Sequence, residues 1–305
     1  MIRKYITKPL RDMVKRKVKN IYDEIEFNKT ELESKIQKPI IPVLYFPYLH
    51  DTPSYIIPQN KVEQEVCEQG LPIPPDSLWL GYGSTKGDYL EPGKKQVNVM
   101  MKLLKGQGFD LSGEKKILDL GCGAGRMIRW LKPLSGESEI WGTDISSEHI
   151  YWANKYLNPP FNFATTTTVP HLPFEDRYFD LIYAGSVFTH IDDLAESWLL
   201  EVKRILKDDG FLYITIHDKG TFDLINSKPV WKDSFISQML NENKKFVDEN
   251  FDVFVMMRGP ASQVFYDIDY FRKSVKNIFE VLSVNPGSYG YQTGVVLKRK
   301  PALKN

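Results

Sequence analysis

Two aspartates, Asp119 and Asp144, each end an apolar run, where a carboxylate is well placed to bind a polar ligand. Glycine recurs at every second position after the first of them, at Gly121, Gly123 and Gly125. Glycine lacks a Cβ, so the backbone can turn sharply there and a ligand can approach it closely. A carboxylate at the end of the following strand can accept hydrogen bonds from both hydroxyls of a ribose. These residue types and their spacing therefore predict a nucleoside-binding site.

The spacing of the glycines separates two classes of nucleoside ligand. A dinucleotide-binding loop has the pattern G-x-G-x-x-G. Here the third glycine comes one residue early, and Arg126 takes the place of the expected glycine. The sequence would match a nicotinamide-dependent oxidoreductase only if the third glycine came one residue later. The observed pattern, D-x-G-x-G-x-G, resembles motif I of the class I S-adenosylmethionine (SAM)-dependent methyltransferases, and the resemblance covers about residues 93–298.

The resemblance implies SAM as the cofactor and a role for each motif residue. Asp119 and the glycine loop would hold the methionine part of SAM, Asp144 the ribose, and Ile145 the adenine. Thr168 stands where the family often has an acid near adenine, and its hydroxyl can still meet the adenine amino group. In related enzymes a segment near Tyr82 closes over SAM, often with a tyrosine near its carboxylate. The further cofactor contacts assigned by the resemblance are Arg126, Val169 and Ser186.

Two histidines are candidates for a catalytic base. Methyl transfer from a sulfonium is an in-line displacement, so the protein mainly aligns the acceptor and excludes water. A hydroxyl acceptor also needs a base, and histidine titrates near neutral pH. His190 follows the predicted fourth strand and His217 ends the fifth, so both strand ends should open into one cleft. Each histidine also has a purely structural alternative, such as bracing a loop.

Acidic residues beside the histidines leave a metal site as a further alternative. Asp192 or Asp218 could orient one of the histidines. With Asp193 and both histidines, the same residues could bind a divalent cation, but their spacing fits no known metal motif. The sequence therefore predicts no metal in the site.

These side chains need a sheet whose strands end at one edge. Apolar runs predict parallel strands at about 117–120, 140–146, 179–183 and 211–216. A further strand, the third in chain order, is expected between residue 161 and the strand at 179–183. The segment after the glycine loop, 127–131, reads as the first turns of a helix. Another helix is expected at about 92–106, and a last one at about 270–279. Strands at about 280–284 and 291–298, joined by a short turn, complete the pattern as a hairpin.

The fold expected from this pattern is a doubly wound α/β sheet of seven mostly parallel strands, with the last one antiparallel. An insertion at about 219–266 follows the fifth strand, where it can act as a lid or an acceptor pocket. It should hold a helix at about 231–249 and an apolar run at 251–257. The SAM-binding domain would span 92–300.

The part before this domain, residues 1–91, differs in character. Positions 1–20 carry eight Lys and Arg and one Asp. Apolar residues at helical spacing predict a helix at about 9–37, followed by a strap rich in Pro and aromatic residues over 40–80 that packs on the domain. We expect a solvated helix laid on its own domain. The alternatives are self-association, a partner protein or contact with an anionic surface.

Composition excludes several classes of protein. The net charge is +1, which gives no electrostatic case for a nucleic-acid partner. The two cysteines, Cys67 and Cys122, exclude a zinc site of the paired-cysteine type and fit a reducing compartment. The chain has no apolar run long enough to span a membrane and no signal-peptide pattern at its start. The expected location is the cytoplasm.

The acceptor is the least determined part of the function. Residues 158–161 match the N-P-P-aromatic motif of amino-group methyltransferases, but they precede the predicted third strand instead of following the fourth. We interpret them as a helix terminator. The most consistent hypothesis is methylation of a hydroxyl on a small molecule or a glycan sugar, based on a loose resemblance to bacterial methyltransferases of polysaccharide pathways. Alternatives are an amine or carboxylate acceptor, or a SAM-binding partner module without catalysis.

Overall fold

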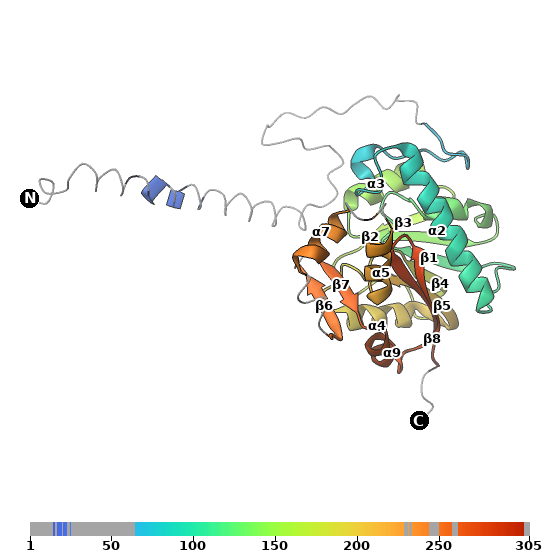
Figure 1. The fold of residues 1–305 in the computed structure, drawn as a ribbon. Coiled ribbons are helices and arrows are strands. Elements are labelled where there is room, and N and C mark those ends of the chain that lie inside the picture. The colour runs from blue at the N-terminus through green and yellow to red at the C-terminus, as the bar shows by residue number, and fades with distance from the viewer. Residues whose placement is uncertain are drawn as a thin grey trace, which may run out of the picture. The chain divides into compact units, whose positions relative to one another are not determined.

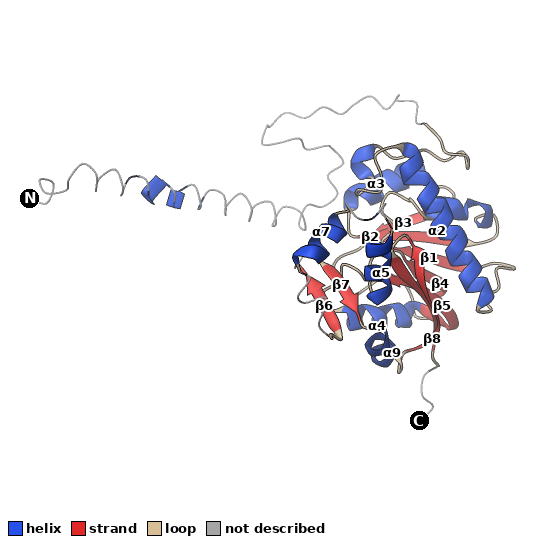
Figure 2. Ribbon diagram, viewed as in Figure 1, coloured by secondary structure: helices blue, strands red, loops and turns tan. Residues whose placement is uncertain are grey.

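The computed structural model (Figures 1 and 2) describes two groups of residues in the chain. Near the start these are Lys15, Lys17–Lys19, Ile21, Tyr22 and Ile25; the second group comprises 65–228, 231, 234–243, 250–257 and 262–301. The chain divides into two compact units, Met1–Ile57 and Pro58–Asn305. The described residues of the first unit are all helical, as expected for that part of the helix at 9–37. The rest of that helix and most of the strap lie outside the described residues.

A seven-stranded sheet forms the centre of the second unit, in the order β3-β2-β1-β4-β5-β9-β8. Its strands are β1 (Lys116–Leu120), β2 (Glu139–Asp144), β3 (Asn162–Thr165), β4 (Phe179–Ala184), β5 (Leu206–Ile216), β8 (Phe279–Tyr289) and β9 (Gln292–Arg299). The first five strands pair in parallel, and β9 runs antiparallel to both β5 and β8. The predicted doubly wound fold, with its antiparallel last strand, is confirmed.

Helices cover both faces of this sheet. They are α2 (Lys86–Gly106), the 3₁₀ helix η2 (Ile128–Leu134) and α3 (Ser147–Tyr156) on one face, and α4 (Ala195–Ile205) and α9 (Ile268–Val275) on the other. Neighbouring strand residues alternate between the two cores, as the pleat requires. Ile117 packs with the α2 side and Leu118 with the α4 side. The carboxyl ends of the parallel strands therefore meet at one edge between two packed layers.

Two helices differ from the prediction for local reasons. Helix α2 begins six residues before the expected start because Thr85 and Asp88 form a capping box, in which each side chain accepts from the other residue's backbone N–H. Pro92 lies inside this helix instead of at its first position. After the glycine loop the chain forms the 3₁₀ helix η2 instead of an α-helix. Pro133 has no N–H for an α-helical hydrogen bond there.

Residues 65–83, in the later part of the expected strap and just beyond it, pack against the α2 side of the sheet. They contain the short 3₁₀ helix η1 (Asp76–Leu78). Cys67, Leu71 and Leu78 are buried in the same core as α2. The compact unit thus begins near residue 58, well before the expected domain boundary at 91/92.

The insertion after β5 forms a small core of its own. It contains α5 (Lys219–Ser227), α7 (Phe235–Glu242) and an antiparallel hairpin of β6 (Val253–Met256) and β7 (Gln263–Tyr266). Their apolar side chains form a third hydrophobic cluster, which includes Phe222, Met239 and Phe265. The expected apolar run at 251–257 is thus one arm of a hairpin. The other arm, β7, was not expected.

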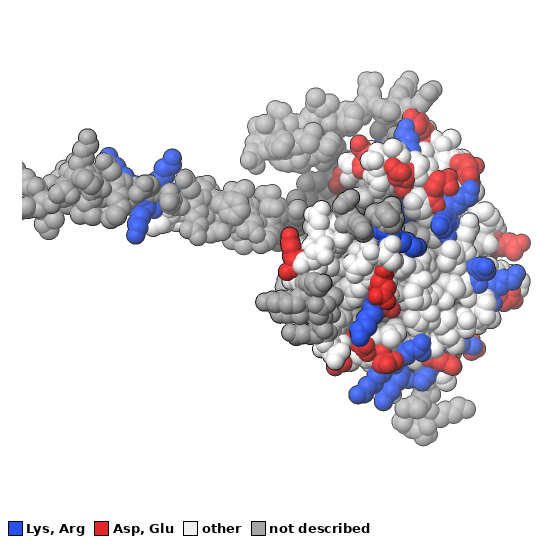
Figure 3. All heavy atoms as spheres, viewed as in Figure 1, with Lys and Arg blue, Asp and Glu red and all other residues white. Residues whose placement is uncertain are grey.

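The surface of the described part carries mixed charge. On the face drawn in Figure 3, basic and acidic side chains lie interspersed with wide uncharged areas. Among the described residues, no helix is both long enough and apolar enough to span a bilayer.

Candidate functional site

The glycine loop folds back onto the carboxyl ends of β1 and β2. Gly121, Gly123 and Gly125 all adopt positive φ angles, of 79°, 52° and 79°, a region that L-residues with a Cβ rarely enter. The backbone N–H of Gly121 donates to the carbonyl of Thr143 at 2.7 Å. The backbone N–H of Gly123 donates to Asp144 Oδ2 at 2.8 Å. The loop is therefore bound to the end of β2 by its own main chain.

Asp144 lies at the tip of β2, as predicted, and it is only partly buried. Its Oδ1 accepts the backbone N–H of Ser146 at 2.8 Å. Each carboxylate oxygen has a second lone pair, so the carboxylate can still accept two ribose hydroxyls. This arrangement fits the ribose of a nucleoside.

Two apolar side chains beside Asp144 are exposed. Ile145, directly after β2, is 60% exposed, and Val169, on the loop after β3, is 61% exposed. The backbone N–H of Thr166 donates to the carbonyl of Asp144 at 2.9 Å, which holds the loop after β3 next to β2. Thr168 is also exposed on that loop. Apolar side chains with a nearby hydroxyl fit the faces and the amino group of an adenine ring.

Asp119 lies beneath the glycine loop, with 2% of its surface exposed. Burial raises the pKa of its carboxyl from 3.8 to about 7, against the opposing effects of the neighbouring Tyr183 hydroxyl and Arg126 guanidinium. A cationic ammonium group would lower this pKa again. Asp119 is thus buried beneath the loop, and its role as the ligand of the methionine ammonium stays a prediction.

Arg126 is buried where the loop meets the strap. Its guanidinium lies 3.9 Å from the ring centroid of Tyr82 and donates a hydrogen bond from Nη2 to the hydroxyl of Tyr289. Its Nη1 is buried with no hydrogen-bond partner among the described residues. A cation with a spare donor suits a carboxylate such as that of methionine. Tyr89, in contrast, is buried in a stack with Trp79.

A polar network connects the ends of β4 and β5 to β9. Ser186, at the end of β4, has a φ of 59° and its backbone N–H donates to Thr215 Oγ1 at 2.7 Å. Thr215 Oγ1 donates to Gln292 Oε1 at 2.6 Å. The amide of Gln292 in turn donates to Ser186 Oγ at 2.8 Å. Thr215 and Gln292 were missed by sequence reasoning, because no local motif links residues so far apart.

His190 is exposed on the loop after β4. Its Nδ1 lies 2.8 Å from the carbonyl of Ser262 and 3.3 Å from the side-chain nitrogen of Gln263. A hydrogen bond to the Ser262 carbonyl, which can only accept, requires the tautomer with the proton on Nδ1. The hydroxyl of Ser262 donates back to the carbonyl of His190 at 2.7 Å. Nε2 is then the unprotonated nitrogen, and it has no hydrogen-bond partner among the described residues. This is the orientation that a general base needs.

His217 is in the opposite situation, with 1% of its surface exposed. Its ring stacks between Phe265 and Tyr291, at centroid distances of 4.7 and 5.8 Å. Its Nε2 lies 3.1 Å from Gln263 Oε1. Burial lowers its pKa to about 3, so it is a weak base.

The acidic residues near the histidines do not gather into a metal site. Asp218 caps α5 and accepts the hydroxyl of Thr293 at 2.8 Å. Among the described residues, no three His, Cys, Asp or Glu side chains lie close enough to hold a metal ion.

Comparison with known proteins finds methyltransferases. Residues 118–214 match the family described as a methyltransferase domain. The chain is 31% identical over 157 residues to the methyltransferase GfsG of Streptomyces halstedii, covering 48% of this chain and 54% of the relative. It is 35% identical over 109 residues to the demethylmenaquinone methyltransferase of Chlorobaculum tepidum, covering 34% and 42%. The chain thus spans about half the length of the curated relatives it matches.

A solved structure shares the fold. The PH0226 protein of Pyrococcus horikoshii aligns with a TM-score of 0.51 and 19% identity, covering 72% of this chain and all of that one. The sheet order, the glycine loop and the matched segment together define a class I methyltransferase fold. The chain therefore has the fold of the class I methyltransferases, and residues 118–214 are similar to a methyltransferase domain, whose class uses SAM as its cofactor.

Proposed function

We propose that this protein transfers the methyl group of SAM to a hydroxyl of a small molecule or of a glycan sugar. The observation that supports a hydroxyl acceptor is the orientation of His190. Its Nδ1–H is held by the Ser262 carbonyl at 2.8 Å, which leaves Nε2 free at the carboxyl edge of the sheet. A hydroxyl must lose its proton as it attacks, and Nε2 can accept that proton.

Three of these residues would bind SAM, and His190 would accept the proton. Bound SAM would supply the electrophilic methyl group on its sulfonium. Asp144 would hold the ribose, Arg126 the carboxylate and Asp119 the ammonium of the methionine part. The acceptor oxygen gains the methyl group as the bond from sulfur to carbon breaks, and His190 takes the proton. The products are a methyl ether and S-adenosylhomocysteine.

A carbon acceptor is the second candidate. One of the curated relatives, from Neisseria meningitidis, is named a ubiquinone/menaquinone biosynthesis C-methyltransferase. A different relative is named a malonyl-[acyl-carrier protein] O-methyltransferase, whose name indicates an oxygen acceptor. An amine acceptor, a carboxylate acceptor and a non-catalytic SAM-binding module are further alternatives. Each gives a different result in the same assay.

Calorimetric titration with SAM tests the cofactor part of the proposal. The wild-type protein should bind SAM, and Asp144→Ala should bind it on the order of a hundredfold more weakly, because two charge-assisted hydrogen bonds are lost. Asp209→Ala is the matched control, since this aspartate is 97% exposed near the start of β5. Normal SAM binding by Asp144→Ala would contradict the assignment.

Turnover to S-adenosylhomocysteine tests the acceptor. We expect turnover with hydroxylated acceptors, and a fall of kcat by about 10² to 10⁴ in His190→Gln with unchanged SAM affinity. Turnover only with quinones or other carbon acceptors would favour the second candidate. SAM binding without turnover on any acceptor class would favour the non-catalytic module.

A further inference from the structure

Four of the seven described residues of the first unit have large apolar side chains that are exposed. Val18, Ile21, Tyr22 and Ile25 are 46%, 55%, 66% and 55% exposed. All four are helical, and their spacings of three, one and three residues place them on one side of the helix. Large apolar side chains in a contiguous exposed row usually mark a surface that binds something.

Lysines flank this apolar face on both sides. At about 100° per residue, Lys15 and Lys19 lie along one side of the face and Lys17 along the other. All three are exposed. The sequence before the face is basic, with eight Lys and Arg and one Asp in positions 1–20, whereas positions 23–26 carry three acidic residues, Asp23, Glu24 and Glu26. An apolar stripe between rows of lysine is the pattern of a helix that lies in a membrane interface, with the lysines reaching the lipid headgroups.

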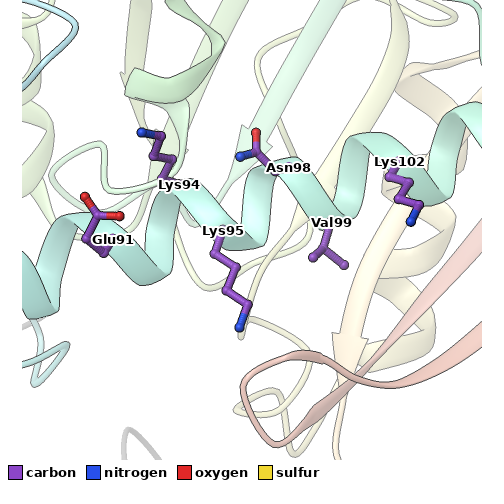
Figure 4. A pocket seen from close by; sticks show the side chains of 6 residues that line it. All are labelled: Glu91, Lys94, Lys95, Asn98, Val99 and Lys102. Atoms are coloured by element: carbon purple, nitrogen blue, oxygen red, sulfur yellow. The ribbon is translucent and has the colours of Figure 1, made fainter.

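A second basic surface in the protein lacks this pattern. On the outer face of α2, Lys94, Lys95 and Lys102 surround a shallow hollow, as Figure 4 shows. Val99 is the only apolar side chain among the residues that line it. Lys94 is also paired with Glu68, at 2.6 Å. This surface has positive charge without an apolar face, so it serves as an internal control.

We infer that the face formed by the described helical residues Val18, Ile21, Tyr22 and Ile25 binds the surface of a membrane whose lipids carry anionic headgroups. Burial of the four apolar side chains supplies the hydrophobic part of the binding free energy, and the lysines supply the electrostatic part. A parallel pair of such helices would bring lysines of the same charge together, and an antiparallel pair is tested by light scattering below. The inference is independent of the proposed function, since it concerns where the enzyme is held and not what it methylates.

Sedimentation of the full-length protein with lipid vesicles tests the inference. Vesicles of phosphatidylcholine mixed with phosphatidylglycerol should bind the protein, and vesicles of pure phosphatidylcholine should bind it much more weakly. Replacing Lys15, Lys17 and Lys19 by Gln should reduce the partition coefficient by about fivefold per lysine, on the order of a hundredfold in total. Val18→Asp with Ile21→Asp should reduce it by at least tenfold. Lys95→Gln with Lys102→Gln on α2 should leave it unchanged.

Several outcomes would overturn the inference. One is equal binding to both kinds of vesicle, and another is an equal loss in the α2 control variant. A dimer in light scattering without vesicles, lost in the Val18 and Ile21 variant, would assign the face to a second copy. A drop in melting temperature in that variant would assign it to the protein's own fold. SAM calorimetry on the same variants should be unchanged, so failure here and failure of the proposed function are distinguishable.

Discussion

The two halves of the site, one around the glycine loop and one around the histidines, are built by different means. In the cofactor half, main-chain hydrogen bonds of Gly121 and Gly123 tie the glycine loop to Thr143 and Asp144, whereas Arg126 is bonded to Tyr289, 163 positions away. In the acceptor half, side chains are held by residues far away in the chain: His190 by Ser262 and Ser186 by Gln292, 72 and 106 positions apart. The glycine loop is thus a local structure, and the acceptor half depends on the complete fold.

Substitution of Gly121 should break the cofactor half, and it has the largest effect we expect. A Cβ at Gly121 would lie 2.4 Å from Val187 Cγ2, and its φ of 79° disfavours any other residue. Gly121→Ala should therefore weaken SAM binding on the order of a thousandfold, through combined strain and overpacking. Calorimetry measures this affinity.

Two further variants separate the causes. Val187→Ala added to Gly121→Ala should restore part of the affinity, because it removes the clash but not the strain. Gly136→Ala is the control, since a Cβ there meets no atom within 4 Å. SAM binding by Gly121→Ala that equals the wild type would show that the loop does not need this backbone conformation.

His217→Phe sharpens the comparison in the acceptor half. The pKa of His217 falls from 6.5 in the unfolded chain to about 3 in the folded protein. Burial of the neutral His217 ring therefore stabilises the fold fully above pH 6.5. The free energy of unfolding decreases by several kcal/mol as the pH falls toward 3, because the unfolded chain then binds a proton that the folded protein does not. Phenylalanine can stack between Phe265 and Tyr291 without titrating.

Urea unfolding at a series of pH values between 7 and 3.5 measures this effect. The wild type should lose more stability with falling pH than His217→Phe does. Parallel curves for the two proteins would mean that the ring titrates in the folded state, and His217 would return as a candidate base.

Asp119→Asn should have the smallest effect of the three. It should make the free protein more stable at high pH but weaken the binding of SAM. Because the folded pKa is raised from 3.8 to about 7, the stability linked to the neutral carboxyl is present below pH 3.8 and lost as the pH rises through 7. The variant should therefore be more stable than the wild type at pH 8 in the absence of SAM, by about 1–3 kcal/mol. It should nevertheless bind SAM more weakly.

Melting temperatures at pH 5 and pH 8, with and without SAM, check both signs. The gain in stability should be smaller at pH 5. A variant that binds SAM as well as the wild type would remove Asp119 from the ammonium site.

The contrast between the halves also explains what could be predicted from the sequence. Most of the strands and the glycine loop follow from apolar runs and from residues within two or three positions of one another, and the doubly wound arrangement followed from the family resemblance. The start of α2, expected at about residue 92, was wrong because Thr85 and Asp88 cap the helix earlier.

Most of the acceptor half could not be predicted from the sequence, because it depends on contacts between residues far apart in the chain. The strand β7 is four residues long and carries a glutamine, so its pattern alone does not identify a strand. The histidines were identified by their positions at strand ends, but only the fold separates exposed His190 from stacked His217. Thr215 and Gln292 become meaningful only when β5 and β9 are seen side by side.

Strand β7 also ties the insertion to the sheet. Its Val264 N–H donates to the carbonyl of Thr189 and its Tyr266 N–H to that of His217, each at 2.9 Å. These main-chain hydrogen bonds join the insertion to the loop that carries His190 and to the end of β5. We therefore expect this part of the insertion to keep its position when a small molecule enters or leaves.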